Sequence, residues 1–125
     1  MPTARRFLVV STVLATAVLS SGAPAGSAPR GFDRCPTGHF CLFDGPGGTG
    51  LMASFRSGSP DLARQGMDNR ASSLAHNVPD TVWCLYDERD YAGTEYQRAY
   101  PGAAGDFGPD WDNRVSSTRL GECSP

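Results

Sequence analysis

The sequence predicts an all-β domain, either a sandwich or a small barrel. Its 125 residues include 15 glycines and 10 prolines, and these turn-forming residues are spread along the chain. Short apolar and aromatic runs of strand length lie between them, and no stretch long enough for an amphipathic helix shows sustained helical spacing. Many short strands separated by turns are typical of sandwiches and small barrels.

Residues 1–25 are expected to be a secretory signal. Arg5 and Arg6 supply a positive start, Phe7–Leu19 is an apolar run, and Ala23-Pro24-Ala25 has the small residues of a cleavage site. The run is shorter than the roughly 20 apolar residues that a membrane-spanning helix needs. We expect cleavage after Ala25, with Ala28 as the second choice, by the general export route or the twin-arginine route. The protein is therefore expected to be extracellular, with no membrane association after cleavage.

The chain after residue 25 is long enough for one domain with a modest core. Gly26–Arg34 is rich in Gly, Pro and Ser and is expected to be a flexible lead to a domain spanning residues 35–125. This part carries nine arginines, 13 acidic residues and no lysine. Nucleic-acid binding depends on clustered Lys and Arg, so the mildly acidic composition argues against a nucleic-acid partner. We expect a monomer.

All four cysteines lie after the signal, and an even number in an exported chain favours two disulfides. They are Cys35, Cys41, Cys84 and Cys123. Three pairings are possible, and the one that closes a short loop between Cys35 and Cys41 leaves Cys84 for Cys123. A four-thiolate zinc site is the alternative; the lack of close C-x-x-C pairs and the oxidising compartment argue against it.

A six-residue signature occurs twice, as Asp68-Asn69-Arg70-Ala71-Ser72-Ser73 and as Asp112-Asn113-Arg114-Val115-Ser116-Ser117. Upstream of each copy, a Cys-Leu-aromatic-Asp run begins at Cys41 or Cys84. The signatures lie 44 residues apart and the runs 43 apart. This spacing indicates an internal duplication, with a first motif at about residues 39–78 and a second at about residues 81–123.

Each half is expected to contain short strands in the same order. They are His39–Phe43, Leu51–Phe55 and Ser72–Ala75 in the first half, and Thr81–Tyr86, Thr94–Arg98 and Val115–Leu120 in the second. The glycine-rich stretch Gly45–Gly50 can only be a loop. A single helical turn is expected in Pro60–Gly66, capped by Ser59 and stopped by Gly66.

The second half resembles a Greek-key motif of the βγ-crystallin superfamily. Tyr86–Gly93 resembles that family's first hairpin, and Trp111–Ser117 resembles its closing signature. In the first half, Gly48 stands where Tyr91 carries the ring, so we expect a looser or less well covered hairpin there. The resemblance spans Phe40–Leu120 and implies a double Greek-key sandwich of two four-stranded motifs.

The resemblance also implies two calcium sites. Calcium prefers six to eight oxygen ligands, and the family mixes side-chain oxygens with the carbonyl of the third signature position and a group from the partner half's first hairpin. The implied ligands are Asp68, Asn69, Arg70 and Ser72, then Asp112, Asn113, Arg114 and Ser116, with Asp44 and Asp87 from the hairpins. Structural roles are implied for Ser73, Ser117, Gly50, Gly93, Tyr86 and Tyr91. Alternatively, Asp-Asn marks a turn and Ser-Ser begins a strand, without metal.

A narrower resemblance concerns Cys35–Asp44, which is similar to the opening of the actinobacterial peptidase inhibitor family typified by Streptomyces metalloproteinase inhibitors. It implies a secreted peptidase as partner, with a metallopeptidase expected first. Inhibition requires a rigid loop that loses little entropy on binding. The candidate loops are Cys35–Cys41, with Pro36, Thr37, Gly38, His39 and Phe40, and Arg56–Gly66, with Leu62.

Two other functions stay open from the sequence: a calcium-stabilised extracellular structural or stress module without an enzyme target, and a small secreted toxin or cell-wall-binding module. Enzymatic activity is not expected. His39 and His76 have no partners at motif spacing, and the HExxH and GxSxG motifs are absent.

Overall fold

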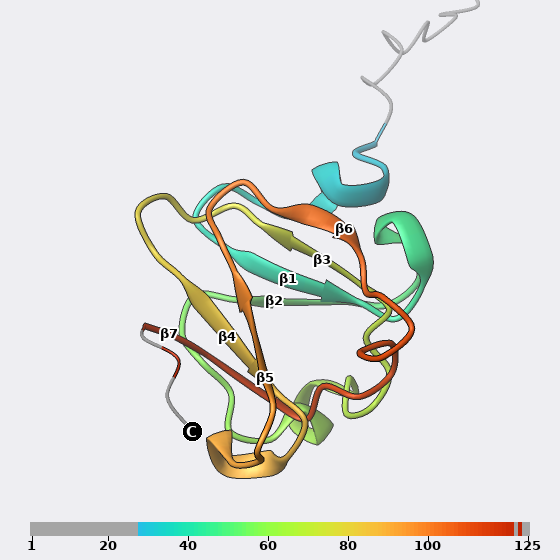
Figure 1. The fold of residues 1–125 in the computed structure, drawn as a ribbon. Helices are drawn as coiled ribbons and strands as arrows, with labels where there is room; N and C mark the ends of the chain where they lie inside the picture. Colours follow the sequence, from blue (N-terminus) through green and yellow to red (C-terminus); the bar gives the residue numbers. More distant parts are fainter. Residues whose placement is uncertain (1–27, 122, 124–125) are drawn as a thin grey trace, which may run out of the picture.

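The computed structural model describes residues 28–121 and residue 123 (Figure 1). Within this part, the chain forms seven short strands and four 3₁₀ helices, without a longer helix. In chain order they are η1 (Gly31–Arg34), β1 (Phe40–Phe43), η2 (Pro46–Gly48), β2 (Met52–Phe55), η3 (Leu62–Gln65), β3 (Ser73–His76), β4 (Trp83–Tyr86), η4 (Arg89–Tyr91), β5 (Tyr96–Ala99), β6 (Ala104–Asp106) and β7 (Ser117–Leu120). The prediction of an all-β chain is confirmed.

The strands form two antiparallel sheets, in the orders β2-β1-β3-β6 and β5-β4-β7. The central strand β1 lies between β2 and β3, as β4 lies between β5 and β7. Strand β6 comes from the second half but pairs with β3 of the first. At the corresponding place in the second sheet, Ser59 forms a single bridge with Thr118. Each sheet is therefore completed by the other half, although the fourth strand expected in the second sheet is reduced to that bridge.

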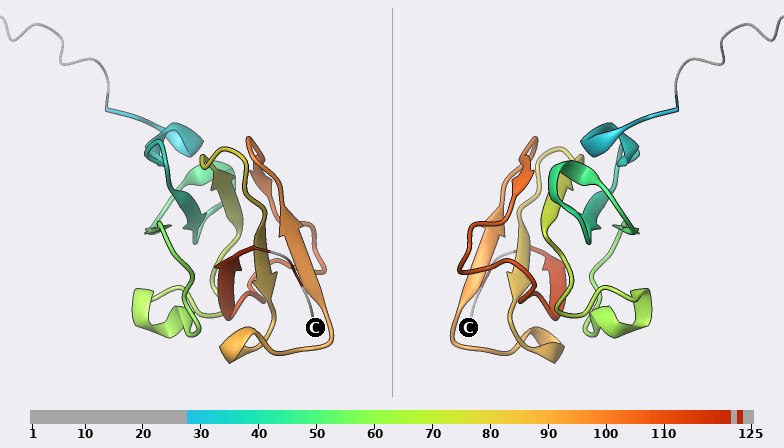
Figure 2. Two further views of the ribbon diagram at one scale, coloured as in Figure 1. Left: turned by 90° about the vertical axis from the view of Figure 1, so that its left-hand side faces the viewer. Right: turned by 90° about the vertical axis from the view of Figure 1, so that its right-hand side faces the viewer.

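The sheets pack on one another around a shared core, and Figure 2 shows them as two layers. Both central strands are buried along their whole length. Phe40 of β1 stacks on Trp83 of β4, with ring centroids 4.7 Å apart. Burial of one such ring stabilises the fold by about 1.5 to 3 kcal/mol. The core also includes Leu42, Ala53, Phe55, Leu62, Met67, Ala71, Leu85, Ala99, Trp111 and Val115.

The observed strands are shorter than the expected runs, except that β3 has the expected length and begins one residue later, and one strand was not predicted. His39, Thr81 and Ser72 lie outside the strands, as do Val115 and Ser116, and Gly45–Gly50 contains the short helix η2. The unpredicted strand is Ala104–Asp106. Its Ala-Gly-Asp sequence lacks the β-branched and aromatic residues that favour strands, and it pairs with the other half of the molecule.

The expectation of a flexible lead is wrong for Gly31–Arg34, which forms η1 and packs on the first hairpin. Phe32 contacts Phe43 edge-on, and Arg34 donates a hydrogen bond of 3.0 Å to the carbonyl of Gly48. Gly48 itself is buried with φ +72°, and a Cβ there would overlap the backbone of η1. The expectation of a poorly covered first hairpin is therefore also wrong, because Phe32 supplies the ring that Gly48 lacks.

The predicted helical turn exists as η3, but its cap differs. The side chain of Asp61, not Ser59, accepts a hydrogen bond of 3.0 Å from the Ala63 amide. Ser59 is buried, and its hydroxyl bonds to Gln65 instead. Gly66 ends the helix, as predicted, and it does so in the left-handed conformation.

Two disulfides brace the fold, joining Cys35 to Cys41 and Cys84 to Cys123. The first closes a short loop before β1, and the second ties β4 to the chain after β7. Within residues 28–121 and 123, no helix has the length and apolarity that crossing a bilayer requires. The expected signal peptide lies outside the described residues.

Candidate functional site

The two signatures meet between the halves of the molecule as a pair of matching turns. The Asn69 amide donates to the carbonyl of Val115, and the Asn113 amide donates to the carbonyl of Ala71, both at 3.0 Å. Asn69 and Asn113 both have a positive φ, of 53° and 61°. Asn tolerates this left-handed conformation better than most residues, which explains why the same residue occupies both turns.

The signature side chains pair across the two halves. The Ser116 hydroxyl lies 3.2 Å from Oδ1 of Asn69, and the Ser72 hydroxyl lies 3.4 Å from Oδ1 of Asn113. The sequence had grouped each serine with the Asp and Asn of its own signature. The structure corrects this grouping, because folding places each serine beside the asparagine of the opposite signature.

Asp68 has a buried carboxylate oxygen without a hydrogen-bond partner, as does the hairpin residue Asp87. In Asp68 this oxygen is Oδ1, while Oδ2 lies 3.5 Å from Nη2 of Arg89. Arg89 comes from the second half and also lies 3.4 Å from the carboxylate of Asp61. Asp112, the equivalent of Asp68, is exposed. We call the two places where the signatures meet the signature corners: one contains Asp68, Asn69 and Ser116, and the other contains Asp112, Asn113 and Ser72. The two corners are therefore related but not identical.

Donor chemistry at these corners fits a hard cation better than a soft one. The Ser116 hydroxyl lies beside the amide oxygen of Asn69, and Asp68 precedes Asn69 in the chain. Its buried carboxylate oxygen, which has no hydrogen-bond partner, is a group that a cation would satisfy. In the described part of the chain, no three His, Cys, Asp or Glu side chains gather closely enough to hold a metal by themselves. Neutral oxygens would have to supply most ligands.

The hairpin carboxylates lie elsewhere than the sequence analysis expected. Oδ1 of Asp44 accepts a hydrogen bond of 2.7 Å from the Leu51 amide, and its Oδ2 pairs with Arg70 at 3.1 Å. Asp87 pairs with Arg114 at 3.2 Å. Each carboxylate thus joins its hairpin to the third residue of its own signature. They do not reach across to the partner signature as expected.

Ser73 and Ser117 close the two hairpins in the same way. The Ser73 hydroxyl donates to the carbonyl of Gly45 at 2.7 Å and accepts from the Gly48 amide at 3.0 Å. The Ser117 hydroxyl donates to the carbonyl of Glu88 at 2.6 Å and accepts from the Tyr91 amide at 3.0 Å. Gly50 and Gly93 have positive φ, and a Cβ at either would overlap the Asp at the base of its hairpin. Tyr91 packs against Tyr86 with centroids 5.9 Å apart.

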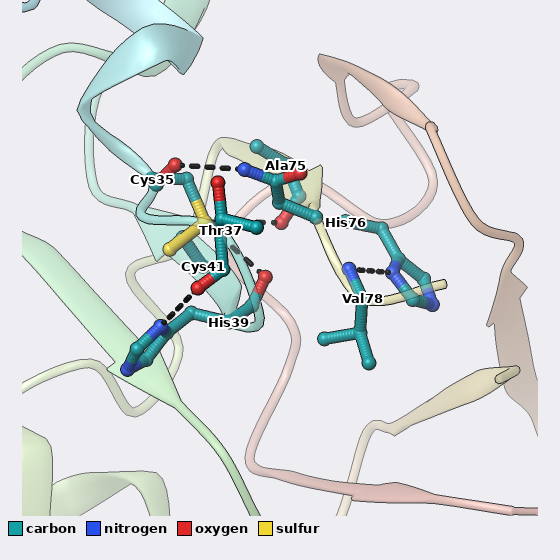
Figure 3. The surroundings of a disulfide bond; sticks show 8 residues. Cys35, Thr37, His39, Cys41, Ala75, His76 and Val78 are labelled. Carbon is teal, nitrogen blue, oxygen red and sulfur yellow. Dashed lines mark hydrogen bonds between the residues drawn. A yellow bond between two sulfur atoms is a disulfide. The ribbon is translucent and has the colours of Figure 1, made fainter. Parts of the chain in front are cut away.

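The Cys35–Cys41 loop presents a rigid turn at the other end of the first sheet. Pro36 and Thr37 are exposed, and the His39 amide donates to the carbonyl of Pro36 at 3.1 Å. Gly38 takes the positive φ of 82° that this tight turn needs. The ring of His39 points to the Thr37 carbonyl, with Nδ1 3.2 Å from that oxygen, as Figure 3 shows.

Asn77 fixes this turn from a neighbouring loop. Its carbonyl accepts from the Gly38 amide at 2.8 Å, its amide donates to the carbonyl of His39 at 3.0 Å, and its side chain donates to the carbonyl of Cys35 at 3.1 Å. Sequence reasoning missed Asn77 because nothing in its neighbourhood marks it as a partner of a loop some 40 residues earlier in the chain. Arg89 and Phe32 were missed for the same reason.

Two of the residues proposed to contact a peptidase are excluded by their burial. Phe40 and Leu62 are both 0% exposed, and both belong to the central core. An inhibitor residue must reach into the target's cleft, so neither side chain can serve. Pro36 and Thr37 remain as the exposed candidates, with Gly38 and His39 partly exposed beside them.

A protein-family model for peptidase inhibitor family I36 matches residues 28–99. Among solved structures, one from work on the evolution of the eye lens βγ-crystallin domain fold is similar, with a TM-score of 0.63, 16% identity, and coverage of 70% of this chain and 89% of the other. A βγ-crystallin from Ciona intestinalis is similar with a TM-score of 0.58 and 22% identity, and the match covers 67% of this chain and 100% of the crystallin. The N-terminal domain of protein S is similar with a TM-score of 0.57 and 23% identity, and the match covers 70% of this chain and 99% of that domain. No curated protein sequence matches. The structural likeness establishes a βγ-crystallin fold.

Proposed function

Because the chain belongs to peptidase inhibitor family I36, we propose that it is a secreted protein inhibitor of peptidases, with a metallopeptidase as its target. Inhibitor families are not enzyme families, which agrees with the lack of catalytic motifs in the sequence. The fold alone would not decide between functions, since one fold hosts many. The family match carries the proposal.

The exposed turn Pro36–His39 is the part of the chain best suited to contact a peptidase. It is closed by a disulfide, by its own hydrogen bond and by three hydrogen bonds to Asn77. A loop that is already rigid loses little conformational entropy when it binds, which favours tight binding. The family match includes this loop and its Asn77 support.

The test is an inhibition assay of the purified protein against a panel of secreted metallopeptidases and serine peptidases. We expect stoichiometric inhibition of at least one metallopeptidase. Thr37→Arg should weaken that inhibition by about tenfold or more, equivalent to about 1.4 kcal/mol of binding free energy. Arg64→Glu is the matched control, because Arg64 is exposed on η3, away from the turn, and this substitution should leave inhibition unchanged. Inhibition of no peptidase would contradict the proposal.

We also propose that the two signature corners bind calcium. One corner would use side-chain oxygens of Asp68, Asn69 and Ser116, and the other those of Asp112, Asn113 and Ser72, with the carbonyls of Arg70 and Arg114. The unpartnered buried Oδ1 of Asp68 and the crossed Ser-Asn pairs support this assignment. Calcium would there act as a structural ion that joins the two halves. Strong calcium stabilisation without inhibition would instead favour a structural module.

A further inference from the structure

His76 is a buried imidazole that bridges two points of the loop after β3. It is 2% exposed. Its Nδ1 lies 3.3 Å from the Val78 amide nitrogen, and its Nε2 lies 3.0 Å from the Thr81 carbonyl; Figure 3 shows the ring turned towards Val78. An amide can only donate and a carbonyl can only accept. The ring is therefore neutral, with its proton on Nε2.

The backbone of His76 and Asn77 connects this bridge to the exposed turn. The His76 amide donates to the carbonyl of Ala103 at 2.7 Å, and its carbonyl accepts from the Gly102 amide at 2.9 Å. The next residue, Asn77, holds Gly38 and His39 by two further backbone hydrogen bonds. A change in the loop that follows His76 would thus be transmitted to the turn through one residue.

The charged and titratable groups around the ring form no ion pair with it in the described part of the chain. Asp33 lines the same hollow as His76, Asp80 lies in the bridged loop, and His39 lies on the adjacent turn. Arg98 lines a neighbouring hollow with Thr81. Burial lowers the pKa of His76, and backbone hydrogen bonds, chiefly the one to Thr81, only partly oppose this.

We propose that His76 is a pH-sensitive positioning residue for the inhibitory turn, and this inference rests on the proposed function. The neutral ring holds the loop from Asn77 to Thr81, and through Asn77 it holds the turn. Protonation places a hydrogen on Nδ1, so that a donor faces the Val78 amide, which is itself a donor. The loop then opens, the turn loses its support, and inhibition weakens in acid.

The pH window follows from linkage. A His whose pKa is lowered in the folded state binds fewer protons than in the unfolded state, so its contribution to stability is complete above the usual pKa of about 6.5. That contribution falls as the pH drops from there towards the folded-state pKa. Weakening of the turn should appear over the same interval.

The experiment measures the inhibition constant of the purified protein between pH 5 and 8 against a metallopeptidase active across that range. Wild type should inhibit more weakly at pH 5.5 than at pH 7.5, by less than about tenfold, because tenfold is the largest effect that an imidazole with the usual pKa of about 6.5 gives over this interval. His76→Asn retains an acceptor for the Val78 amide, and His76→Gln retains a donor for Thr81. Neither variant titrates, so both should lose the pH dependence. His39→Gln removes the other described histidine; whatever its effect on the inhibition constant itself, the pH dependence should remain.

Amide exchange of Val78 and Gly38, whose amides bond to His76 and Asn77, measured without any peptidase, separates the two claims. Weaker protection in acid for wild type, with each rate compared with the intrinsic exchange rate at the same pH, and no such change in His76→Asn, supports the positioning role even if no peptidase is inhibited, in which case only the proposed function fails. A pH-independent inhibition constant in wild type, or an unchanged slope in both His76 variants, would overturn the inference.

Discussion

Phe32 contacts Phe43 edge-on with ring centroids 6.0 Å apart, and this arrangement reproduces the contact of Tyr91 with Tyr86 at 5.9 Å. In the second hairpin the covering ring comes from the hairpin itself. In the first it comes from η1, ahead of the repeat, with the Arg34 guanidinium 5.5 Å from the Phe43 ring. Both hairpins are therefore covered by an aromatic ring, which comes from η1 in the first half and from the hairpin itself in the second.

Removing this ring should destabilise the first hairpin. Phe32→Ala is expected to lower the free energy of unfolding by about 1 to 2 kcal/mol, since Phe32 is only partly buried and loses part of a full ring's contribution. Chemical denaturation measures the change. Tyr91→Ala is the comparison in the second hairpin and should cost a similar amount. An unchanged midpoint for Phe32→Ala would show that η1 contributes nothing to the hairpin.

The glycine at position 48 should be required for this packing. Gly48→Ala places a Cβ into the backbone of η1 and also strains a positive φ, whereas Gly47→Ala strains a similar φ of 63° with open space around it. We expect Gly47→Ala to cost about 1 kcal/mol and Gly48→Ala to cost clearly more. The denaturant midpoints of the two variants measure the difference between these two losses of stability. Equal losses would mean that the close approach of η1 is not tight.

Arg89 should compete with calcium at the corner that contains Asp68. Its guanidinium lies 3.5 Å from that carboxylate, so a bound cation would meet its positive charge. Calcium at millimolar concentration is expected to raise the thermal midpoint through binding to the native state. Arg89→Ala should increase that rise, and Asp68→Ala should reduce it.

The control for calcium is Arg64→Ala, because Arg64 is exposed on η3 and forms no ion pair with a described residue. It should behave as wild type does. A midpoint that does not respond to millimolar calcium in wild type would exclude the calcium proposal.

The two disulfides should contribute unequally. Cys84 and Cys123 are 39 residues apart, whereas Cys35 and Cys41 are 6 apart. In the chain-entropy model, the longer closed loop stabilises by about 4 kcal/mol and the shorter by about 2 kcal/mol. Unfolding of the two paired Cys→Ala variants measures the difference. A larger loss for the short loop would point to a role of Cys35–Cys41 beyond chain entropy.

Much of the fold was predictable because the duplication repeats the same strands and turns. The expected strands around Cys41 and Cys84 lie at the centres of the two sheets. Ala104–Asp106 was not predictable, because its strand conformation depends on pairing with β3 and not on its own sequence. Gly31–Arg34 was missed similarly, since its order depends on the space above Gly48.

The candidate site was predicted in part. The signature residues do meet between the halves, but which serine meets which asparagine depends on how the halves pack. The burial of Leu62 could not be inferred, because a lone apolar residue in a polar loop is compatible with either exposure or burial. Asn77 supports a turn some 40 residues earlier in the chain, for which the local sequence carries no signal. The side chain of His76 contacts Val78 and Thr81 nearby in the chain, but its burial is not evident from the sequence.

The proposed function depends on contact between the turn Pro36–His39 and a peptidase. Hydrogen exchange of this protein, free and in complex with an inhibited metallopeptidase, tests it most directly. Complex formation should slow exchange in the Cys35–Cys41 loop, at Thr37 above all, and leave Leu62–Gln65 unchanged. Protection confined to Leu62–Gln65 or the signature corners, with the loop unaffected, would contradict it.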